Sequence, residues 1–285
     1  MDLFSRALNA VGHFKGKARL VNSLGHFIST HNNRYQTLSL GNGVTLRLDL
    51  GDRIQRLMWG GAYEPHVKNC MKALLRPGDT FVDVGAHIGF FSMFALSLIG
   101  EGDGRVFAFE ANPQLFPKLE SNFSGRRGCT AYPKAVWRES GRILFSDPMQ
   151  AGESGWGKVA AVRNEGNVTA VEAISLDDWH AEIGSVPVRL LKIDAEGSEP
   201  AIFEGALELI QRSRPYIVTE INDVLLEESG YSERTTLEGI RGLSYLVFSI
   251  RRSQLVDVPI NAQSASLEVL CVPSEKVSEV ESLFA

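Results

Sequence analysis

Four residues in the first half of the chain have types and spacing that suit a nucleoside site. Asp83, Gly85 and Gly89 form the pattern Asp-x-Gly-x-x-x-Gly, and Glu110 follows about twenty residues later. In doubly wound folds, a glycine turn at a helix N-terminus and an acid at the end of the next strand hold a nucleoside ribose. Both oxygens of a carboxylate can accept hydrogen bonds from the ribose hydroxyls. The pattern therefore predicts a nucleoside-containing cofactor.

The glycine spacing separates two classes of cofactor. Dinucleotide sites use Gly-x-Gly-x-x-Gly, in which the middle glycine lets the backbone approach a pyrophosphate. Here His87 and Ile88 precede Gly89, so no glycine occupies the pyrophosphate position. A cofactor with a ribose and an amino-acid tail but no phosphate fits better, and S-adenosylmethionine is such a molecule. An NAD-dependent oxidoreductase is the less favoured alternative.

A second group of acids follows two later apolar runs. Asp194 and Glu196 come directly after one run, and Glu220 ends the next. Carboxylates at the ends of neighbouring strands can act as a general base or hold a metal ion. We therefore expect Asp194, Glu196 and Glu220 to be the catalytic residues, with Asp194 as the first choice of base.

The same residues offer a metal-dependent alternative. Asp194, Glu220 and Asn222 would form an all-oxygen ligand set, which hard divalent cations such as Mg²⁺ prefer. Nothing in the sequence requires a metal ion, so a side-chain base and a bound cation both stay open at this point.

The elements that must position these residues alternate between strand and helix. Residues 80–84 are a β-branched and aromatic run, typical of a buried strand, and residues 88–99 continue as an apolar helix. This alternation predicts an α/β sheet with ligands at the carboxyl ends of its strands. Further strands are predicted at residues 106–109, 130–133, 141–145, 168–174, 188–193, 216–219, 245–250 and 267–272.

Composition places the chain among ordinary globular proteins. Its 285 residues are 44% hydrophobic and 22% charged, with a net charge of -5. A mildly acidic protein has no overall field that attracts nucleic acid, so a nucleic-acid substrate is not expected. Cys70, Cys129 and Cys271 are far apart, which indicates reduced thiols, and the longest apolar run is too short to span a bilayer. We therefore expect a cytoplasmic protein.

The first 60 residues are predicted to form a helical and β-hairpin extension, and residues 61–285 the main domain. Alternation around Gly41-Asn-Gly43 indicates the hairpin. Basic residues dominate the N-terminal helical segment, which allows contact with a membrane surface. The favoured alternative is a cap packed on the main domain. Residues 151–158, rich in Gly and Ser, are predicted to be a loop that either borders the site or stays on the surface.

Three blocks of sequence resemble the FkbM-type methyltransferases. They are Phe81-Val-Asp-Val-Gly-Ala-His-Ile-Gly-Phe-Phe-Ser, Ala108-Phe-Glu-Ala-Asn-Pro and Leu191-Lys-Ile-Asp-Ala-Glu-Gly-Ser-Glu. The resemblance spans roughly residues 61–220. It implies a class I, Rossmann-like sheet of mostly parallel strands in the order 3-2-1-4-5-7-6. It also implies an S-adenosylmethionine-dependent O-methyltransferase that acts on hydroxyls of sugars, glycolipids, polysaccharides or glycosylated natural products.

The turn and the resemblance together imply a set of cofactor-binding residues. His87 stands where Asn is more usual and Ala111 where Pro is more usual, so the contacts to the methionine tail are open. A cofactor-binding domain that serves as a non-catalytic partner is an alternative from another class. The expected cofactor-binding residues are Glu64, Asp83, Gly85, Ala86, His87, Gly89, Phe90, Ser92, Glu110, Ala111 and Asn112.

Overall fold

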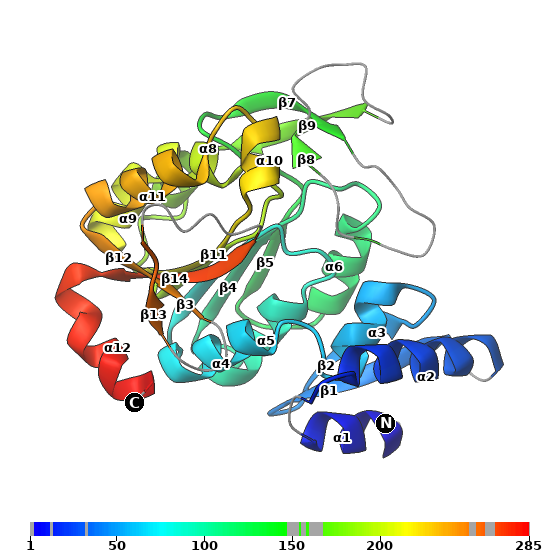
Figure 1. The fold of residues 1–285 in the computed structure, drawn as a ribbon. Helices are drawn as coiled ribbons and strands as arrows, with labels where there is room; N and C mark the ends of the chain where they lie inside the picture. The colour runs from blue at the N-terminus through cyan, green and yellow to red at the C-terminus, as the bar shows by residue number, and fades with distance from the viewer. Residues whose placement is uncertain are drawn as a thin grey trace.

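A twisted sheet with helices on both faces forms the centre of the molecule (Figure 1). Its eight strands lie in the order β13-β12-β14-β11-β10-β3-β4-β5. The computed structural model describes residues 3–11, 14–31, 34–146, 154, 158–159, 168–250, 255–259 and 266–284. The strands are β3 (Thr80–Val84), β4 (Arg105–Phe109), β5 (Cys129–Tyr132), β10 (Leu190–Ile193), β11 (Tyr216–Ile221), β12 (Tyr245–Ser249), β13 (Val256–Asp257) and β14 (Leu267–Pro273).

The strand order agrees with the one that the sequence implies. Strands β5, β4, β3, β10 and β11 are parallel. Strand β14 pairs antiparallel with β11, and β12 pairs antiparallel with β14, so β14 runs against the five parallel strands and β12 runs with them. Numbered within this sheet alone, these seven strands have the order 3-2-1-4-5-7-6, and β13 adds a short edge. The order reverses between β3 and β10, which is where open α/β sheets bind ligands.

Two apolar layers hold the sheet, because its central strands are buried on both faces. All five residues of β3 and all four of β10 are buried, as expected for parallel strands covered by helices. One face is covered by α4 (Pro65–Leu74), α5 (Phe90–Ile99), α6 (Phe116–Phe123) and α12 (Val277–Phe284). The other is covered by α7 (Leu176–Glu182), α8 (Glu199–Glu204), α9 (Leu207–Ser213), α10 (Asp223–Glu228) and α11 (Glu233–Gly242).

The N-terminal residues pack on this domain through a hairpin and three helices. Strands β1 (Tyr35–Gly41) and β2 (Val44–Asp49) pair as the sequence predicts, and Asn42 and Gly43 both have positive φ at the turn. Buried hairpin leucines share one core with α5. The segment also contains α1 (Leu3–Ala10), α2 (Lys17–His31) and α3 (Arg53–Trp59), and α3 was not predicted. The division at residue 60 stays a prediction.

A second, smaller sheet lies beside the edge strand β5. Its order is β6-β9-β7-β8, formed by β6 (Ala135–Val136), β7 (Gly141–Ser146), β8 (Lys158–Val159) and β9 (Val168–Ile174). The predicted strands 141–145 and 168–174 are therefore confirmed, although they form a separate sheet. Most of the predicted loop 151–158 lies outside the described residues. No helix in the described ranges combines the length and the apolar character needed to cross a bilayer.

Candidate functional site

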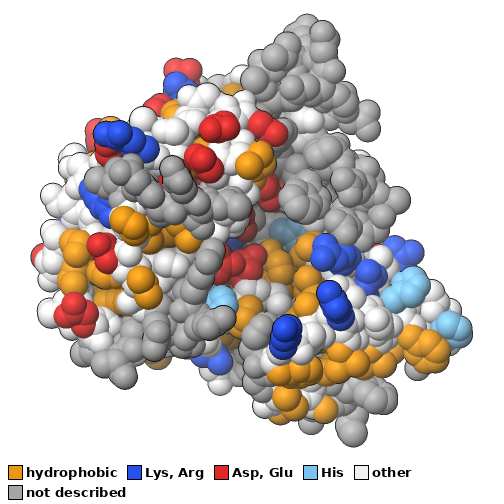
Figure 2. Space-filling view, viewed as in Figure 1, with side chains coloured by type: hydrophobic (Ala, Val, Ile, Leu, Met, Phe, Trp, Pro, Cys, Tyr) orange, Lys and Arg blue, Asp and Glu red, His pale blue; other side chains and the backbone are white. Residues whose placement is uncertain are grey.

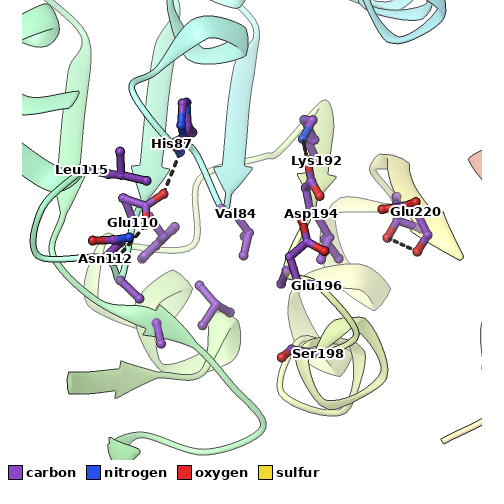
Figure 3. Close-up of a pocket in the computed structure, with 18 of the residues that line it drawn as sticks. Val84, His87, Glu110, Asn112, Leu115, Lys192, Asp194, Glu196, Ser198 and Glu220 are labelled. Atoms are coloured by element: carbon purple, nitrogen blue, oxygen red, sulfur yellow. Dashed lines mark hydrogen bonds and ion pairs between the residues drawn. The ribbon is translucent and has the colours of Figure 1, made fainter. Parts of the chain in front are cut away.

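A cavity of about 290 Å³ opens at the carboxyl ends of β3, β4, β10 and β11 (Figure 3). It lies at the reversal of strand order, and its size is at the lower end of small-molecule sites. The structure brings nine of the predicted site residues to its wall. They are Glu64, Gly85, His87, Glu110, Ala111, Asn112, Asp194, Glu196 and Glu220.

The turn between β3 and α5 forms one wall of the cavity. Gly85 has φ 77°, and a Cβ atom added there would lie 1.8 Å from the backbone oxygen of Asp194. Only glycine therefore fits between β3 and the end of β10. The amides of Gly85 and Ala86 donate to the carbonyl of Phe109 at 3.0 and 2.9 Å, which ties the turn to the end of β4.

Glu110 is held by the backbone on both sides. Its Oε2 accepts a hydrogen bond from the amide of His87 at 2.7 Å, and its Oε1 accepts one from the amide of Asn112 at 2.8 Å. The residue is only 7% exposed. These two amides fix the orientation of the carboxylate. The amide of His87 is therefore committed to Glu110.

The imidazole of His87 also lines the cavity. The residue has φ 56°, a left-handed conformation that His adopts more readily than most residues. Its Nε2 lies 2.6 Å from the hydroxyl of Ser154. Burial, helped by the charge of Lys118, lowers the pKa of His87 to about 4. A neutral ring therefore stands where the family more usually has Asn.

Five of the predicted cofactor residues do not line the cavity. Ser92 donates to Oδ2 of Asp83 at 2.6 Å, deep in the core behind the turn. Phe90 packs edge-to-face against Tyr63, and a Cβ at Gly89 would meet Leu119 of α6. These residues lie on the side of the turn and of α5 that faces the core. They therefore support the turn and do not line the cavity. The five residues are Asp83, Ala86, Gly89, Phe90 and Ser92.

A buried lysine, whose importance the sequence did not reveal, organises the opposite end of the cavity. Nζ of Lys192 lies 2.7 Å from Oδ2 of Asp194, and Lys192 is the register partner of Asp83 on β3. Burial alone would lower the pKa of Lys192, but Asp194, Glu64 and Asp83 together raise it above its ordinary value. The ammonium thus balances a group of acids. A lysine inside the apolar strand β10 was the available signal.

Two acids on the wall have strongly perturbed pKa values. Burial, together with the charges of Asp194 and Glu220, raises the pKa of Glu196 to about 8. Burial also raises the pKa of Glu64 to about 8; Lys192 opposes this shift, while the charge of Asp194 adds to it. Perturbed carboxyl groups of this kind gather at functional sites.

Backbone strain is concentrated around the same cavity. Seven non-glycine residues have positive φ among those that the structure describes, and three of them line the cavity: Glu64 at 35°, His87 at 56° and Glu196 at 50°. Such conformations cost free energy and persist where the surrounding structure imposes them, often at functional sites. The strain therefore supports the assignment of this cavity as the functional site.

The predicted metal ligands do not fit a cation. Glu220 accepts a hydrogen bond from Ser266 at 2.6 Å, and Asn222 caps α10 through the amide of Leu225 instead of facing the cavity. Asp194 is paired with Lys192. Within the described ranges, no three His, Cys, Asp or Glu residues are grouped so that they could hold a metal ion. The proposed set Asp194, Glu220 and Asn222 is therefore not assembled.

The turn and Glu110 match the requirements of S-adenosylmethionine. A close approach of backbone at Gly85 and an oriented carboxylate at Glu110 suit a nucleoside with a small polar tail. Figure 3 places Glu110 and Asn112 on one side of Val84, and Asp194 and Glu196 on the other. The cavity therefore has two ends: the end with Glu110 and Asn112, called the nucleoside end because the sequence predicts a nucleoside there, and the acidic end with Asp194 and Glu196.

Comparison with known proteins gives concordant results. The chain is 24% identical over 184 residues to the 2-O-methyltransferase NoeI of Sinorhizobium fredii, covering 60% of this chain and 74% of NoeI. It is 33% identical over 147 residues to the hexuronic acid methyltransferase AglP of Haloferax volcanii, covering 50% and 56%. A crystal structure of methyltransferase FkbM from Methylobacillus flagellatus has 15% identity and a TM-score of 0.43, covering 77% and 54%.

The family model described as the methyltransferase FkbM domain matches residues 83–247, more than half of the chain. The matched region contains the turn, Glu110 and the acidic end of the cavity. The chain therefore belongs to the FkbM methyltransferase family, and it is an S-adenosylmethionine-dependent methyltransferase with the class I fold.

Proposed function

We propose that the chain methylates a hydroxyl group of a sugar, either free or within a glycolipid, polysaccharide or glycosylated natural product. The observation that carries this proposal is the two-ended cavity, which has an oriented carboxylate at one end and acids of raised pKa at the other. The name of AglP, a hexuronic acid methyltransferase, supports a carbohydrate acceptor. The prefix 2-O in the name of NoeI supports methylation of one specific hydroxyl group of the acceptor.

At the nucleoside end, this chain's residues bind and orient the cofactor. Glu110 would accept hydrogen bonds from the ribose, since the amides of His87 and Asn112 already hold its plane. Ala111 and Asn112 follow Glu110 on the wall and would border the adenine. Glu64 and Gly85 would face the methionine end. When bound, S-adenosylmethionine supplies a methyl group on a sulfonium that is already a good leaving group.

At the acidic end, the residues position the acceptor hydroxyl and remove its proton. Glu196 is the better base. A base whose pKa lies near the working pH is deprotonated in a useful fraction of the molecules and still has a strong driving force to accept a proton. Its raised pKa of about 8 meets that condition, whereas Asp194 is held in an ion pair with Lys192. We therefore propose Glu196, in place of Asp194, as the base. Asp194 and Glu220 would orient the acceptor.

Proton removal by a side chain needs no cation in this arrangement. The predicted cation ligands are committed elsewhere, through Ser266, the start of α10 and Lys192. In-line placement of the hydroxyl supplies much of the acceleration, because a positioned nucleophile converts a bimolecular step into one within a complex. The carboxylate of Glu196 receives the proton of the hydroxyl as the new bond forms.

Ligand binding tests the cofactor, and methyl transfer tests the reaction. S-adenosylhomocysteine should raise the melting temperature of the purified chain, whereas NAD should leave it unchanged. Incubation with labelled S-adenosylmethionine and a panel of uronic acids, hexoses and deoxyhexoses should then label one class of acceptor. Stabilisation by NAD alone would overturn the cofactor assignment. Cofactor binding without label on any sugar or crude glycan extract would favour the non-catalytic alternative.

A further inference from the structure

Exposed apolar side chains are concentrated near the N-terminus of the described chain. Ten large hydrophobic residues are exposed among the described residues, and half of them fall between residues 11 and 35. Figure 2 shows an orange row over α1 and α2, with Lys, Arg and His side chains beside it. The five residues are Val11, Phe14, Leu20, Phe27 and Tyr35, of which Phe27 is 60% exposed.

Helix α2 carries two separate apolar faces. One face packs inward: a Cβ at Gly60 would lie 2.4 Å from Val21, and one at Gly25 would lie 2.8 Å from Arg56. The other face carries Leu20 and Phe27, seven residues apart and therefore on one side of the helix. On this second face Leu20 is 49% exposed and Phe27 is 60% exposed, and Phe27 stacks on the ring of His31 of the same helix. Helix α2 thus carries exposed apolar side chains that take no part in its packing on α3.

Positive charge is also concentrated near the N-terminus. Residues 1–48 contain six Lys or Arg residues and one Asp, a net charge of +5. The remainder contains 23 basic and 33 acidic residues, a net charge of -10. Lys15 and Arg19 are exposed at the start of α2, beside the apolar face. We call the residues Phe14, Lys15, Arg19, Leu20 and Phe27 the α2 patch.

We propose that the α2 patch binds the surface of an anionic lipid bilayer. A helix with an exposed apolar face and neighbouring basic residues inserts at the interface, where it gains apolar burial and attraction to acidic headgroups. A second copy of the chain is a poorer partner, because a two-fold interface would place Lys15 and Arg19 against the same positive region of the other copy. A nucleic acid would leave Leu20 and Phe27 uncovered.

The patch lies one helix away from the cavity. Helix α2 packs on α3, and Ile54 of α3 lines the cavity wall. None of the patch residues lines the cavity, so changes there leave the site intact. Membrane binding and methyl transfer can therefore be measured separately.

Vesicle co-sedimentation with the full chain tests the proposal. Vesicles of phosphatidylcholine and phosphatidylglycerol should carry the protein into the pellet, and pure phosphatidylcholine vesicles should carry much less. Replacing Lys15 and Arg19 by Gln should lower the partition coefficient about twentyfold, because each basic residue at an anionic surface contributes on the order of fivefold. Added salt should reduce binding of the wild-type chain in the same direction.

The apolar residues have a matched control. Leu20→Ser with Phe27→Ser should lower the partition coefficient at least about tenfold, since two exposed apolar side chains lose their lipid contacts. Leu207→Ser, which changes a residue 41% exposed on α9, and Arg234→Gln on α11 should leave binding unchanged. Circular dichroism and methyl transfer to a soluble acceptor should match the wild type in every variant.

Two outcomes would overturn the proposal. The wild-type chain could stay in the supernatant with both kinds of vesicle. Alternatively, it could form a dimer in light scattering that the Leu20→Ser and Phe27→Ser pair dissociates, without any binding to vesicles. The second result would assign the α2 patch to a second copy of the chain.

Discussion

The two ends of the cavity differ in how well they stabilise a negative charge. At the nucleoside end, the carboxylate of Glu110 receives hydrogen bonds from two backbone amides, so its position and charge are both supported. At the acidic end, Glu196 lies near Asp194 and Glu220, and burial raises its pKa to about 8. The first arrangement stabilises a fixed charge, and we propose that the second exchanges a proton.

This difference follows from the local chain. Glu110 directly follows β4 and accepts a hydrogen bond from the amide of His87 in the β3–α5 turn. Glu196 has a left-handed backbone conformation with φ 50°, which places a second acid beside Asp194. Pre-oriented dipoles suit binding, and a carboxyl group of raised pKa suits a base. The predictions below test that division of labour.

The largest expected effect is on turnover, in Glu196→Gln. Gln keeps the shape of the side chain but cannot accept a proton, so turnover should fall about a hundredfold to ten-thousandfold. Affinity for S-adenosylhomocysteine should change by less than about twofold, since Glu196 lies at the acidic end (Figure 3). Steady-state kinetics and calorimetry check both values. Glu208→Gln, on the surface of α9, is the matched control.

The pH profile sharpens the same assignment. Because the base must be deprotonated, the wild-type rate should rise with pH and level off above the pKa of Glu196, about 8. Glu196→Gln should lose this rise. Asp194→Asn should lower turnover less than Glu196→Gln does and should keep the rise. The reverse ranking of the two variants would return the role of base to Asp194.

The next effect is on cofactor affinity, in Glu110→Ala. The variant removes the carboxylate that is expected to receive the ribose and leaves the amides of His87 and Asn112 without their acceptor. Affinity for S-adenosylhomocysteine should fall about a hundredfold, as expected for the loss of charged hydrogen bonds. Glu110→Gln, which keeps one acceptor oxygen, should show an intermediate loss by calorimetry. Wild-type affinity in both variants would place the ribose elsewhere.

A smaller effect is expected on stability, in Lys192→Met. The ammonium balances Asp194, Glu64 and Asp83, so its removal leaves buried acids without a counter-charge. Breaking a buried pair from one side should lower the free energy of unfolding by about 3 kcal/mol. Urea denaturation measures the loss, and Lys72→Met, at an exposed position of α4, should change it by less than about 0.5 kcal/mol.

The pH dependence of this loss has a definite sign. Without Lys192, the pKa values of the neighbouring acids rise in the folded state, so the folded chain binds more protons than the unfolded chain does. Stability then falls as pH rises above the ordinary range of carboxyl groups. The deficit of Lys192→Met should therefore shrink in acid and grow as pH rises from the ordinary carboxyl range towards neutrality, and it should stop growing below the ordinary pKa of lysine, 10.5, above which the wild type loses the contribution of Lys192 as well. An equal deficit at every pH would indicate lost packing against Phe91, and not lost charge.

Local patterns predicted the sheet and placed Glu110 and Gly85 at the wall of one cavity. The buried strand β3 and the alternating elements after it are visible in residue type alone, and the resemblance supplied their order. Glu110 could be proposed from the sequence because a carboxylate that binds a ribose requires only a strand end and a neighbouring turn. The role of Lys192 was not predicted, because its partners Glu64 and Asp83 come from other elements. The raised pKa of Glu196 likewise depends on burial and neighbours that only the fold brings together.

The smallest effect is expected from metal removal. Treatment with EDTA should leave turnover unchanged within about twofold, because Asn222 caps α10, Glu220 accepts from Ser266 and Asp194 pairs with Lys192. Asn222→Ala should cost about 1 kcal/mol of stability through the lost cap and should not reduce turnover selectively. If EDTA abolished turnover and Mg²⁺ restored it, the acidic end would be a cation site assembled only with both substrates bound. Glu196 would then be a ligand or an orienting group, and the contrast between the two ends would lie in cation binding instead of proton transfer.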